Sequence, residues 1–285
     1  MPYQIGKLPP GIKTLTVNNY QMAYLECGQG IPLVLVHGSL NDYRAWTTQM
    51  EAFGACYRTI AVSLRHGYPE CWNGRGGNYS IHQHADDLAR FVQALNLGPV
   101  HLAGHSRGGD VALIVAARHS GLLRTLVLAD PAPLDGLLPR TAEVILAAEK
   151  RRAFVTAALQ RLQQGDTEGG LEIFIDAVST PGSWKRLPPS ARQIRRENAW
   201  SIVSLLADAR EPFSCADAQK IDVPVLLVAG ENSPPLYGMM RDALKTCLNR
   251  YQEVTIPRAS HGMNRDNPDS FNRAVLDFLA RQAAR

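Results

Sequence analysis

The stretch from Val100 to Ala116, VHLAGHSRGGDVALIVA, constrains the fold of this chain more than any other part. A short apolar run leads into residues 104–108 (GHSRG), which match the G-x-S-x-G pattern of a serine on a sharp turn between a strand and a helix. Glycines are needed on both sides of Ser106 because a side chain there would collide with the strand or the helix. The helix that follows points the positive end of its dipole at the serine. We therefore predict a nucleophile elbow rather than a glycine-rich turn without chemistry.

Short apolar runs alternate with helical patterns in most of the chain, which predicts an α/β fold with a mostly parallel sheet. Several of these runs are apolar throughout, as expected for strands that are buried on both faces. The predicted strands cover residues 12–17, 20–27, 31–36, 57–63, 100–103, 123–129, 223–229 and 253–256. A length of 285 residues allows one large domain or two small ones.

The stretch 134–218 breaks this alternation because it contains no convincing strand pattern. We predict a helical cap there, inserted into a core domain that is formed by residues 1–133 and 219–285. Helical patterns in the cap cover residues 141–162, 171–179 and 191–209. Its many charged side chains are expected to lie on solvated helix faces rather than in a binding patch; they include Lys150, Arg151, Arg152, Arg195, Arg196 and Glu197.

The charge and the cysteines exclude several classes of protein. The net charge is only +4 and the basic residues are scattered, so no nucleic-acid surface is indicated. No apolar run approaches a membrane span, and the N-terminal residues lack a hydrophobic core of signal-peptide length. The five cysteines are widely spaced without a Cys-x-x-Cys pair, which suggests neither a zinc site nor a disulfide framework. We expect a soluble protein of a reducing compartment, the cytoplasm.

Three predicted loop tips carry residues for nucleophilic catalysis. A serine hydroxyl is a poor nucleophile near neutral pH, so Ser106 needs a base, and that base needs an acid that fixes its tautomer. His261 is the natural base because it follows the last predicted strand, 253–256. Asp130 stands at the carboxyl end of the strand 123–129, where ligands bind in open α/β sheets, although a turn aspartate before proline is common.

The loop after the strand 31–36 offers main-chain donors for an oxyanion. It begins with His37-Gly38, a sharp bend that leaves backbone N–H groups free. We expect the N–H groups of Ser39 and Arg107 to be the two donors. His37 is expected to pack and orient this loop, and together with His105 it is a candidate for the rim of the substrate pocket.

A long loop at residues 64–79 follows the fourth predicted strand, and long loops in compact domains are often functional. Its aromatic residues include Tyr68 and Trp72. Two interpretations remain equally open at this point. These side chains either wall a substrate pocket or pin the loop to the surface.

His37-Gly38, residues 104–108 and residues 260–268 together resemble the α/β-hydrolase superfamily over nearly the whole chain. The resemblance implies an eight-stranded, mostly parallel sheet under a helical cap. It also implies a Ser-acid-His triad that works through an acyl-enzyme and needs no metal or cofactor. Because the nucleophile position holds serine, the chain is unlike the epoxide hydrolases and haloalkane dehalogenases, which use aspartate there.

The acid departs from the common pattern of that superfamily. Most members carry Asp after the seventh strand at the position of Ser233, which cannot hold a charge. Asp130 and Glu231 are the remaining candidates, and we favour Asp130. Some members, including lactonases of the zearalenone type, carry the acid after the sixth strand and share a Ser-Pro in the later loop. Glu231 directly follows the strand glycine and is expected to point away.

These features predict a serine hydrolase that cleaves a carboxylic ester or a lactone of a small molecule. Alternatives are carbon–carbon bond hydrolysis or cofactor-free perhydrolysis on the same triad, or a small-ligand receptor with slow turnover. The intact Ser106 and His261 weigh against the receptor. Substrate specificity is expected to depend on the cap, and the sequence of the cap does not indicate which substrate is bound. A homodimer through an exposed cap helix stays open.

Overall fold

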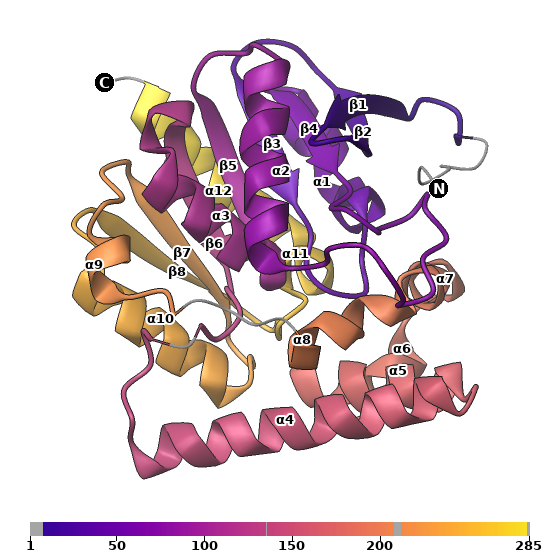
Figure 1. Cartoon of the computed structure of the whole chain (residues 1–285). Helices are drawn as coiled ribbons and strands as arrows, with labels where there is room; N and C mark the ends of the chain where they lie inside the picture. Colours follow the sequence, from indigo (N-terminus) through magenta and orange to yellow (C-terminus); the bar gives the residue numbers. More distant parts are fainter. Residues whose placement is uncertain (1–7, 135, 208–211, 284–285) are drawn as a thin grey trace.

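Eight strands form one sheet at the centre of the computed structural model, which describes residues 8–134, 136–207 and 212–283 (Figure 1). The spatial order is β1-β2-β4-β3-β5-β6-β7-β8, and only the pairs β1–β2 and β2–β4 are antiparallel. This confirms the predicted mostly parallel, eight-stranded sheet. The bounds are β1 (Lys13–Val17), β2 (Tyr20–Cys27), β3 (Pro32–Val36), β4 (Arg58–Val62), β5 (Val100–His105), β6 (Leu123–Ala129), β7 (Val225–Gly230) and β8 (Tyr251–Ile256).

Helices cover both faces of the sheet. In Figure 1, α2 (Ile81–Ala94) and α3 (Arg107–Arg118) lie in front of it, and α1 (Thr47–Gly54) and α12 (Pro268–Ala283) lie behind it. The strand β3 shows why its sequence is apolar throughout. Val34 and Val36 join the core of the first face, together with α10 (Pro235–Cys247), whereas Leu33 and Leu35 join the core of the second. Successive residues of a strand point to opposite faces, so both alternating sets must be apolar.

The strand order reverses between β3 and β5, and this reversal positions the site. From β3 the chain passes outward to β4 and then returns to the other side of β3 as β5. The loops that leave β3 and β5 therefore diverge at the carboxyl ends of adjacent strands. Such a switch point is where ligands bind in open α/β sheets.

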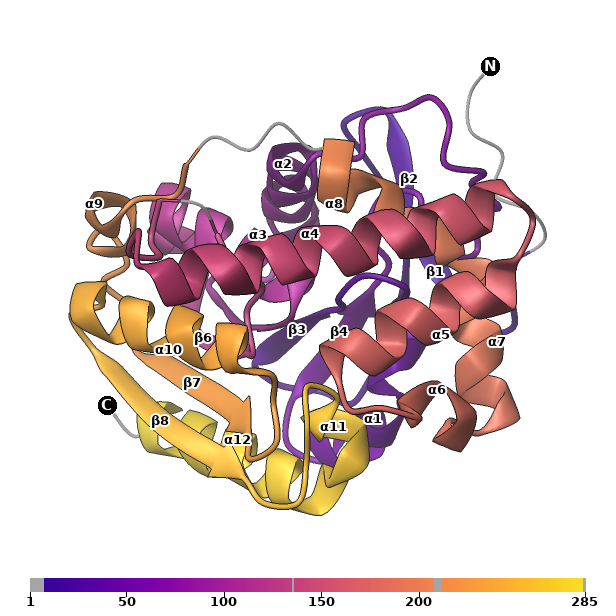
Figure 2. The same ribbon diagram turned by 90° about the horizontal axis from the view of Figure 1, so that it is seen from below.

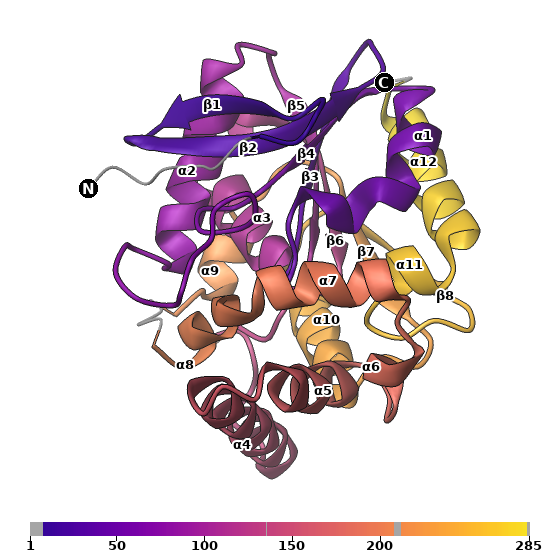
Figure 3. The same cartoon turned by 90° about the vertical axis from the view of Figure 1, so that its right-hand side faces the viewer.

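Every described element between β6 and β7 is helical, and the helices from α4 to α8, which we call the cap, lie across the carboxyl ends of the strands, whereas α9 lies beside α10 (Figures 1 and 2). Figure 3 shows α7 between the strand ends and helices α5 and α6. The predicted domain boundaries at 134 and 218 stay a prediction. The helices are α4 (Ala142–Gln163), α5 (Thr167–Val178), α6 (Ser183–Arg186), α7 (Pro189–Glu197), α8 (Ser204–Ala207) and α9 (Cys215–Ala218).

Leu40 anchors these helices to the core. Its side chain is fully buried in an apolar cluster that otherwise belongs to the cap and includes Val155, Phe174 and Trp184. Its backbone N–H donates to Ser201 Oγ at 2.8 Å. The loop that follows β3 is thus held in place by contacts with the cap.

The predicted helix over 191–209 ends early. The helix α7 stops at Glu197, and a 3-10 turn (Ala199–Val203) follows it, while residues 208 and 209 lie outside the described residues. At this break the buried side-chain amide of Asn198 donates to Asp42 Oδ2 at 2.6 Å, and its Oδ1 accepts the backbone N–H of Tyr68 at 3.0 Å. These bonds tie the end of α7 to the core domain.

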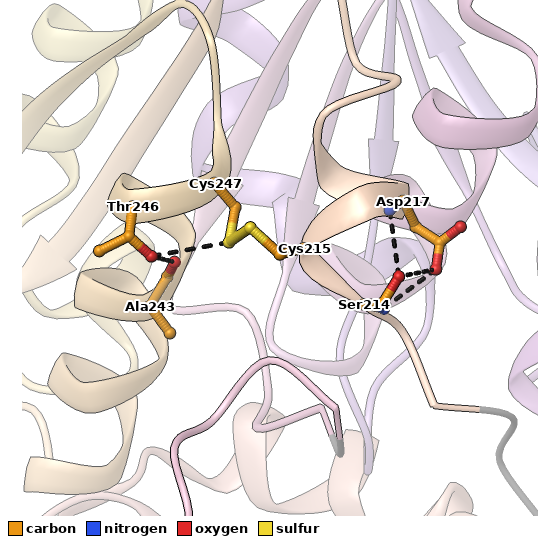
Figure 4. Close-up of a disulfide and its surroundings, with 6 residues drawn as sticks. All are labelled: Ser214, Cys215, Asp217, Ala243, Thr246 and Cys247. Atoms are coloured by element: carbon orange, nitrogen blue, oxygen red, sulfur yellow. Dashed lines mark hydrogen bonds between the residues drawn. A yellow bond between two sulfur atoms is a disulfide. The ribbon is translucent and has the colours of Figure 1, made fainter.

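Cys215 and Cys247 form a disulfide between the start of α9 and the end of α10 (Figure 4). The spacing of the cysteines suggested no disulfide framework, and this bond corrects that interpretation for Cys215 and Cys247. The two residues are 32 positions apart, and only the fold brings their Cα atoms to 5.1 Å. Because structural disulfides are typical of oxidising compartments, cysteine usage gives the expected reducing compartment no support. Within the described ranges, no helix combines the length and the apolar character that a membrane crossing requires.

We expect the C215S/C247S double variant to be less stable than wild type by about 3–4 kcal/mol, because the cross-link removes entropy from the unfolded chain. Urea unfolding followed by circular dichroism measures this difference, and a reductant should lower wild type to the level of the variant. C71S removes an exposed free thiol and is the matched control. Equal stability of oxidised wild type and double variant would show that the bond does not contribute.

Candidate active site

Ser106 occupies a strained turn between β5 and α3. Its φ of 54° and ψ of −126° lie outside the regions that L-residues normally adopt. Glycine is required at both flanking positions, because a Cβ on Gly104 would meet the backbone of Gly108, and one on Gly108 would meet the carbonyl of Val36. The Ser106 carbonyl accepts the N–H of Gly109 at 2.8 Å and so begins the helix. The side chain is thereby lifted above the end of the sheet.

His261 and Asp130 meet beside this turn. Asp130 directly follows β6 and is 2% exposed, and its Oδ2 lies 3.4 Å from His261 Nδ1. Ser233 Oγ donates to the same carboxylate oxygen at 2.5 Å. Glu231 lies elsewhere: its exposed carboxylate accepts the backbone N–H of Arg258 at 2.7 Å. The structure thus places Asp130, and not Glu231, beside the histidine.

Burial changes the pKa values of Asp130 and His261. Burial raises the pKa of the Asp130 carboxyl to about 7, against the opposing effect of the Ser233 hydrogen bond. Burial and the positive charge of Arg265 lower the pKa of the His261 imidazole to about 3. The Asp130 carboxyl therefore binds a proton below about pH 7 and loses it above that pH. Above that pH the pair consists of a carboxylate and a neutral imidazole.

Two rings fix the orientation of His261. Tyr237 stacks on it with a centroid distance of 4.0 Å, and His105 lies at 4.6 Å on a tilted plane. His105 Nε2 donates to the carbonyl of His261 at 2.6 Å. His105 therefore ties the end of β5 to the histidine loop. The sequence indicated His105 as a pocket residue, and it does line the cavity, but its hydrogen bond gives it a positioning role as well.

The loop after β3 packs directly on the serine. A Cβ on Gly38 would lie 2.8 Å from Ser106 Cβ, so only glycine allows this approach. The buried His37 holds the loop, because its Nε2 accepts the N–H of Leu64 at 3.0 Å and its Nδ1 donates to the carbonyl of Gly38 at 2.8 Å. This is the orienting role that the sequence favoured for His37. Ser39 follows and lines the same cavity as Ser106 and Arg107.

A narrow cavity of about 60 Å³ lies above Ser106, between the core and the cap. The core contributes Ser39, Ser106 and His261, and the cap contributes Phe154 and Arg195. Among the described residues, no hydrogen bond joins Ser106 to His261, although both face this cavity. A second cavity of about 340 Å³ shares Phe154 and Tyr237 with the first and continues outward between α4 and α10. It is largely apolar; its lining includes Leu146, Ala147, Pro234, Leu236 and Met239.

Tyr68 and Trp72 are not in the lining of either cavity. Trp72 stacks with His66 at 4.8 Å and with Tyr79 at 4.9 Å, and these two rings are themselves 6.1 Å apart. The ring of Tyr68 lies under the Arg44 guanidinium at 3.7 Å. These contacts fit the interpretation that the aromatic side chains pin the long loop to the surface.

Sequence reasoning missed the arginines of the cavity. Arg151 and Arg195 were expected on solvated helix faces, but both line the cavity, and Arg195 is only 5% exposed. A signal for Arg195 exists in helical spacing. It lies four residues after the buried Ala191, on the face of α7 that turns toward the core. The described parts of the chain hold no cluster of three or more His, Cys, Asp or Glu side chains that could bind a metal.

Comparisons with known proteins agree with this arrangement. The model of the alpha/beta hydrolase family matches residues 33–274. The chain is 25% identical to the (E)-2-((N-methylformamido)methylene)succinate hydrolase of Acinetobacter baylyi, over 94% of this chain and 97% of that protein. It is 27% identical to the non-heme chloroperoxidase CPO-A1 of Kitasatospora aureofaciens, over 93% and 98% of the two chains. A solved thermophilic esterase from Thermogutta terrifontis has the same fold, with a TM-score of 0.75 at 24% identity over 95% of this chain and 98% of that one. Since the family model spans the sheet from β3 onward together with Ser106, Asp130 and His261, this chain belongs to the α/β hydrolase family.

Proposed function

We propose that this chain is a serine hydrolase that cleaves a carboxylic ester or a lactone of a small molecule. One observation carries the proposal. The strained Ser106 shares a narrow cavity with His261, whose Nδ1 faces the buried Asp130. A nucleophile, a base and an acid in this arrangement are the requirements of acyl transfer through a covalent intermediate.

In the proposed mechanism, Ser106 Oγ attacks the carbonyl carbon of the substrate while His261 Nε2 takes the hydroxyl proton. Asp130 accepts the Nδ1–H of His261, which leaves Nε2 free as the base and stabilises the imidazolium that forms. The carbonyl oxygen becomes an oxyanion, which the N–H groups of Ser39 and Arg107 stabilise. Return of the proton to the leaving oxygen breaks the ester bond and gives an acyl-Ser106. A water molecule, deprotonated by His261, then releases the acid.

The comparisons support the assignment to the hydrolases, but they do not identify the substrate. One relative is itself named a hydrolase and aligns over almost its full length, and a solved esterase shares the fold. The orientation of the Arg107 side chain is also favourable. Its guanidinium donates to the carbonyl of Tyr79 at 3.0 Å, which directs the side chain toward the long loop.

We expect S106A to abolish both fluorophosphonate labelling and hydrolysis of 4-nitrophenyl butyrate. D130N should lower kcat by about 10⁴-fold, because the histidine loses the partner that fixes its tautomer. E231Q should stay within about 2-fold of wild type, since its carboxylate faces the Arg258 backbone and surface substitutions are mostly neutral. Steady-state kinetics and intact mass measure these effects. A large loss of kcat in E231Q would assign the role of the acid to Glu231. If folded wild type neither reacts with the fluorophosphonate nor hydrolyses the ester, the proposed hydrolase activity is wrong.

We expect kcat/KM to rise with pH and to level off above an apparent pKa of about 7, because the Asp130 carboxyl must lose its proton before it can stabilise the imidazolium of His261. S233A should move this acid limb to higher pH, since the lost hydrogen bond stabilises the carboxylate and lowers its pKa. Stopped-flow assays from pH 5 to 9 measure the limb, and E231Q is the control on the same loop. An unshifted limb in S233A would show that the hydroxyl does not tune Asp130.

A further inference from the structure

The cavity beside Ser106 holds more positive charge than ester cleavage requires. Besides Arg107, whose guanidinium donates to the carbonyl of Tyr79, three arginines line it: Arg151 and Arg195 from the cap and Arg265 from α11 (Met263–Asp266). None of the described residues in its lining is acidic. Buried guanidinium groups normally have a counter-charge, so the partners of Arg195 and Arg265 decide how well the charge in this cavity is compensated.

Arg195 is the least compensated of the three. No hydrogen bond or ion pair joins its guanidinium to any residue that the structure describes, and its Nε is buried without a partner. Burial and the charge of Arg265 lower the pKa of Arg195 to about 9. Asp42 attracts it from a distance, but the oxygens of Asp42 are already bound by Arg44 and by Asn198, at 2.6–2.8 Å. Burial of the Arg195 guanidinium without a partner therefore costs free energy of folding. The side chain faces the open cavity beside Ser106.

Arg265 approaches the same space from the histidine loop. Its Nη2 lies over the Cα of Gly262, where any Cβ would collide with it, directly beside His261. Its acidic neighbour Asp266 lies 3.6 Å away, and the other oxygen of that carboxylate accepts the N–H of Ser260. Asp266 thus compensates Arg265 only in part. Two guanidinium groups repel one another across the cavity, and an anion between them would remove this repulsion.

We propose that the substrate carries a carboxylate in addition to its scissile ester or lactone, and that Arg195 and Arg265 bind this carboxylate in the cavity beside Ser106. The inference deepens the proposed function and rests on it for the reaction. Guanidinium groups match a carboxylate because their planar N–H donors pair with both of its oxygens. A compact carboxylate also suits the cavity of about 60 Å³, whereas the apolar cavity that continues past Phe154 and Tyr237 accommodates the remainder of the molecule.

The first test compares matched charged and neutral esters. The monoethyl esters of succinate, glutarate and adipate carry the carboxylate, and the corresponding diethyl esters do not. We expect wild type to prefer the monoester of at least one length, measured as the ratio of the two kcat/KM values. R195Q should lower this ratio about 10- to 100-fold, the usual effect of losing a hydrogen bond to a charged group. R195K should recover part of the preference.

Arg196 offers a matched control on the same helix. Its guanidinium pairs with Glu168 on the outer surface, so R196Q should leave the ratio unchanged. Thermal unfolding of each variant separates binding from structure. Because Arg195 has no described partner, R195Q should be at least as stable as wild type. A large drop in Tm without a change in the ratio would assign Arg195 a structural role and overturn the proposal.

A binding measurement makes the carboxylate site testable without turnover. Calorimetric titration of S106A with glutarate should show binding that weakens at least about 10-fold in S106A/R195Q. If wild type hydrolyses both esters without preference, the carboxylate site is wrong and the serine hydrolase stands. If wild type hydrolyses neither ester but S106A binds glutarate through Arg195, the hydrolase is wrong and the anion site stands. If wild type prefers ethyl 4-phosphonobutyrate to the carboxylate esters, the proposed carboxylate ligand is wrong and the site binds a phosphonate-like dianion.

Discussion

The close approach of two backbones at the ends of β3 and β5 is the constraint on which the rest of the site depends. Gly38 and Gly108 are the contact points, and neither position has room for a Cβ. This approach brings the loop with Ser39 against Ser106, and it requires β3 and β5 to be neighbours in the sheet. The strain at Ser106 is tolerated because the apolar strands and the helices on both faces hold these ends rigidly.

The core and the cap contribute different things to the cavity. The proposed reaction uses groups at the ends of core strands, which sit on a sheet that cannot deform easily. The groups proposed to recognise the substrate come in part from α7, which is connected to the core by Asn198, by the Leu40 cluster and by the ion pair of Arg44 with Glu197. Because these contacts lie away from the elbow, the other surfaces of the cap can vary in sequence without disturbing Ser106.

Much of the fold and part of the site follow from local sequence. The strands β2 and β6 agree with the predicted ranges because each is a bounded apolar or alternating run, and the elbow is visible from its two glycines. Asp130 could be favoured from its place at a strand tip, and the structure puts it at 3.4 Å from His261. The disulfide between Cys215 and Cys247 could not be predicted, because it depends on how α9 packs against α10. Arg195 was assigned to solvent because charged side chains in a helical pattern are mostly exposed, although its spacing from Ala191 places both residues on one face of α7.

The hydrogen bond between Ser233 and Asp130 has a consequence for how such sites evolve. The loops that follow the neighbouring strands β6 and β7 carry Asp130 and Ser233. The two side chains meet at 2.5 Å beside the imidazole of His261. Either tip is therefore in reach of the histidine, and a negative charge at one of them makes a hydroxyl sufficient at the other. A lineage could transfer the acid between the sixth and seventh strands through two point substitutions, with the backbone unmoved and the serine and histidine in place throughout.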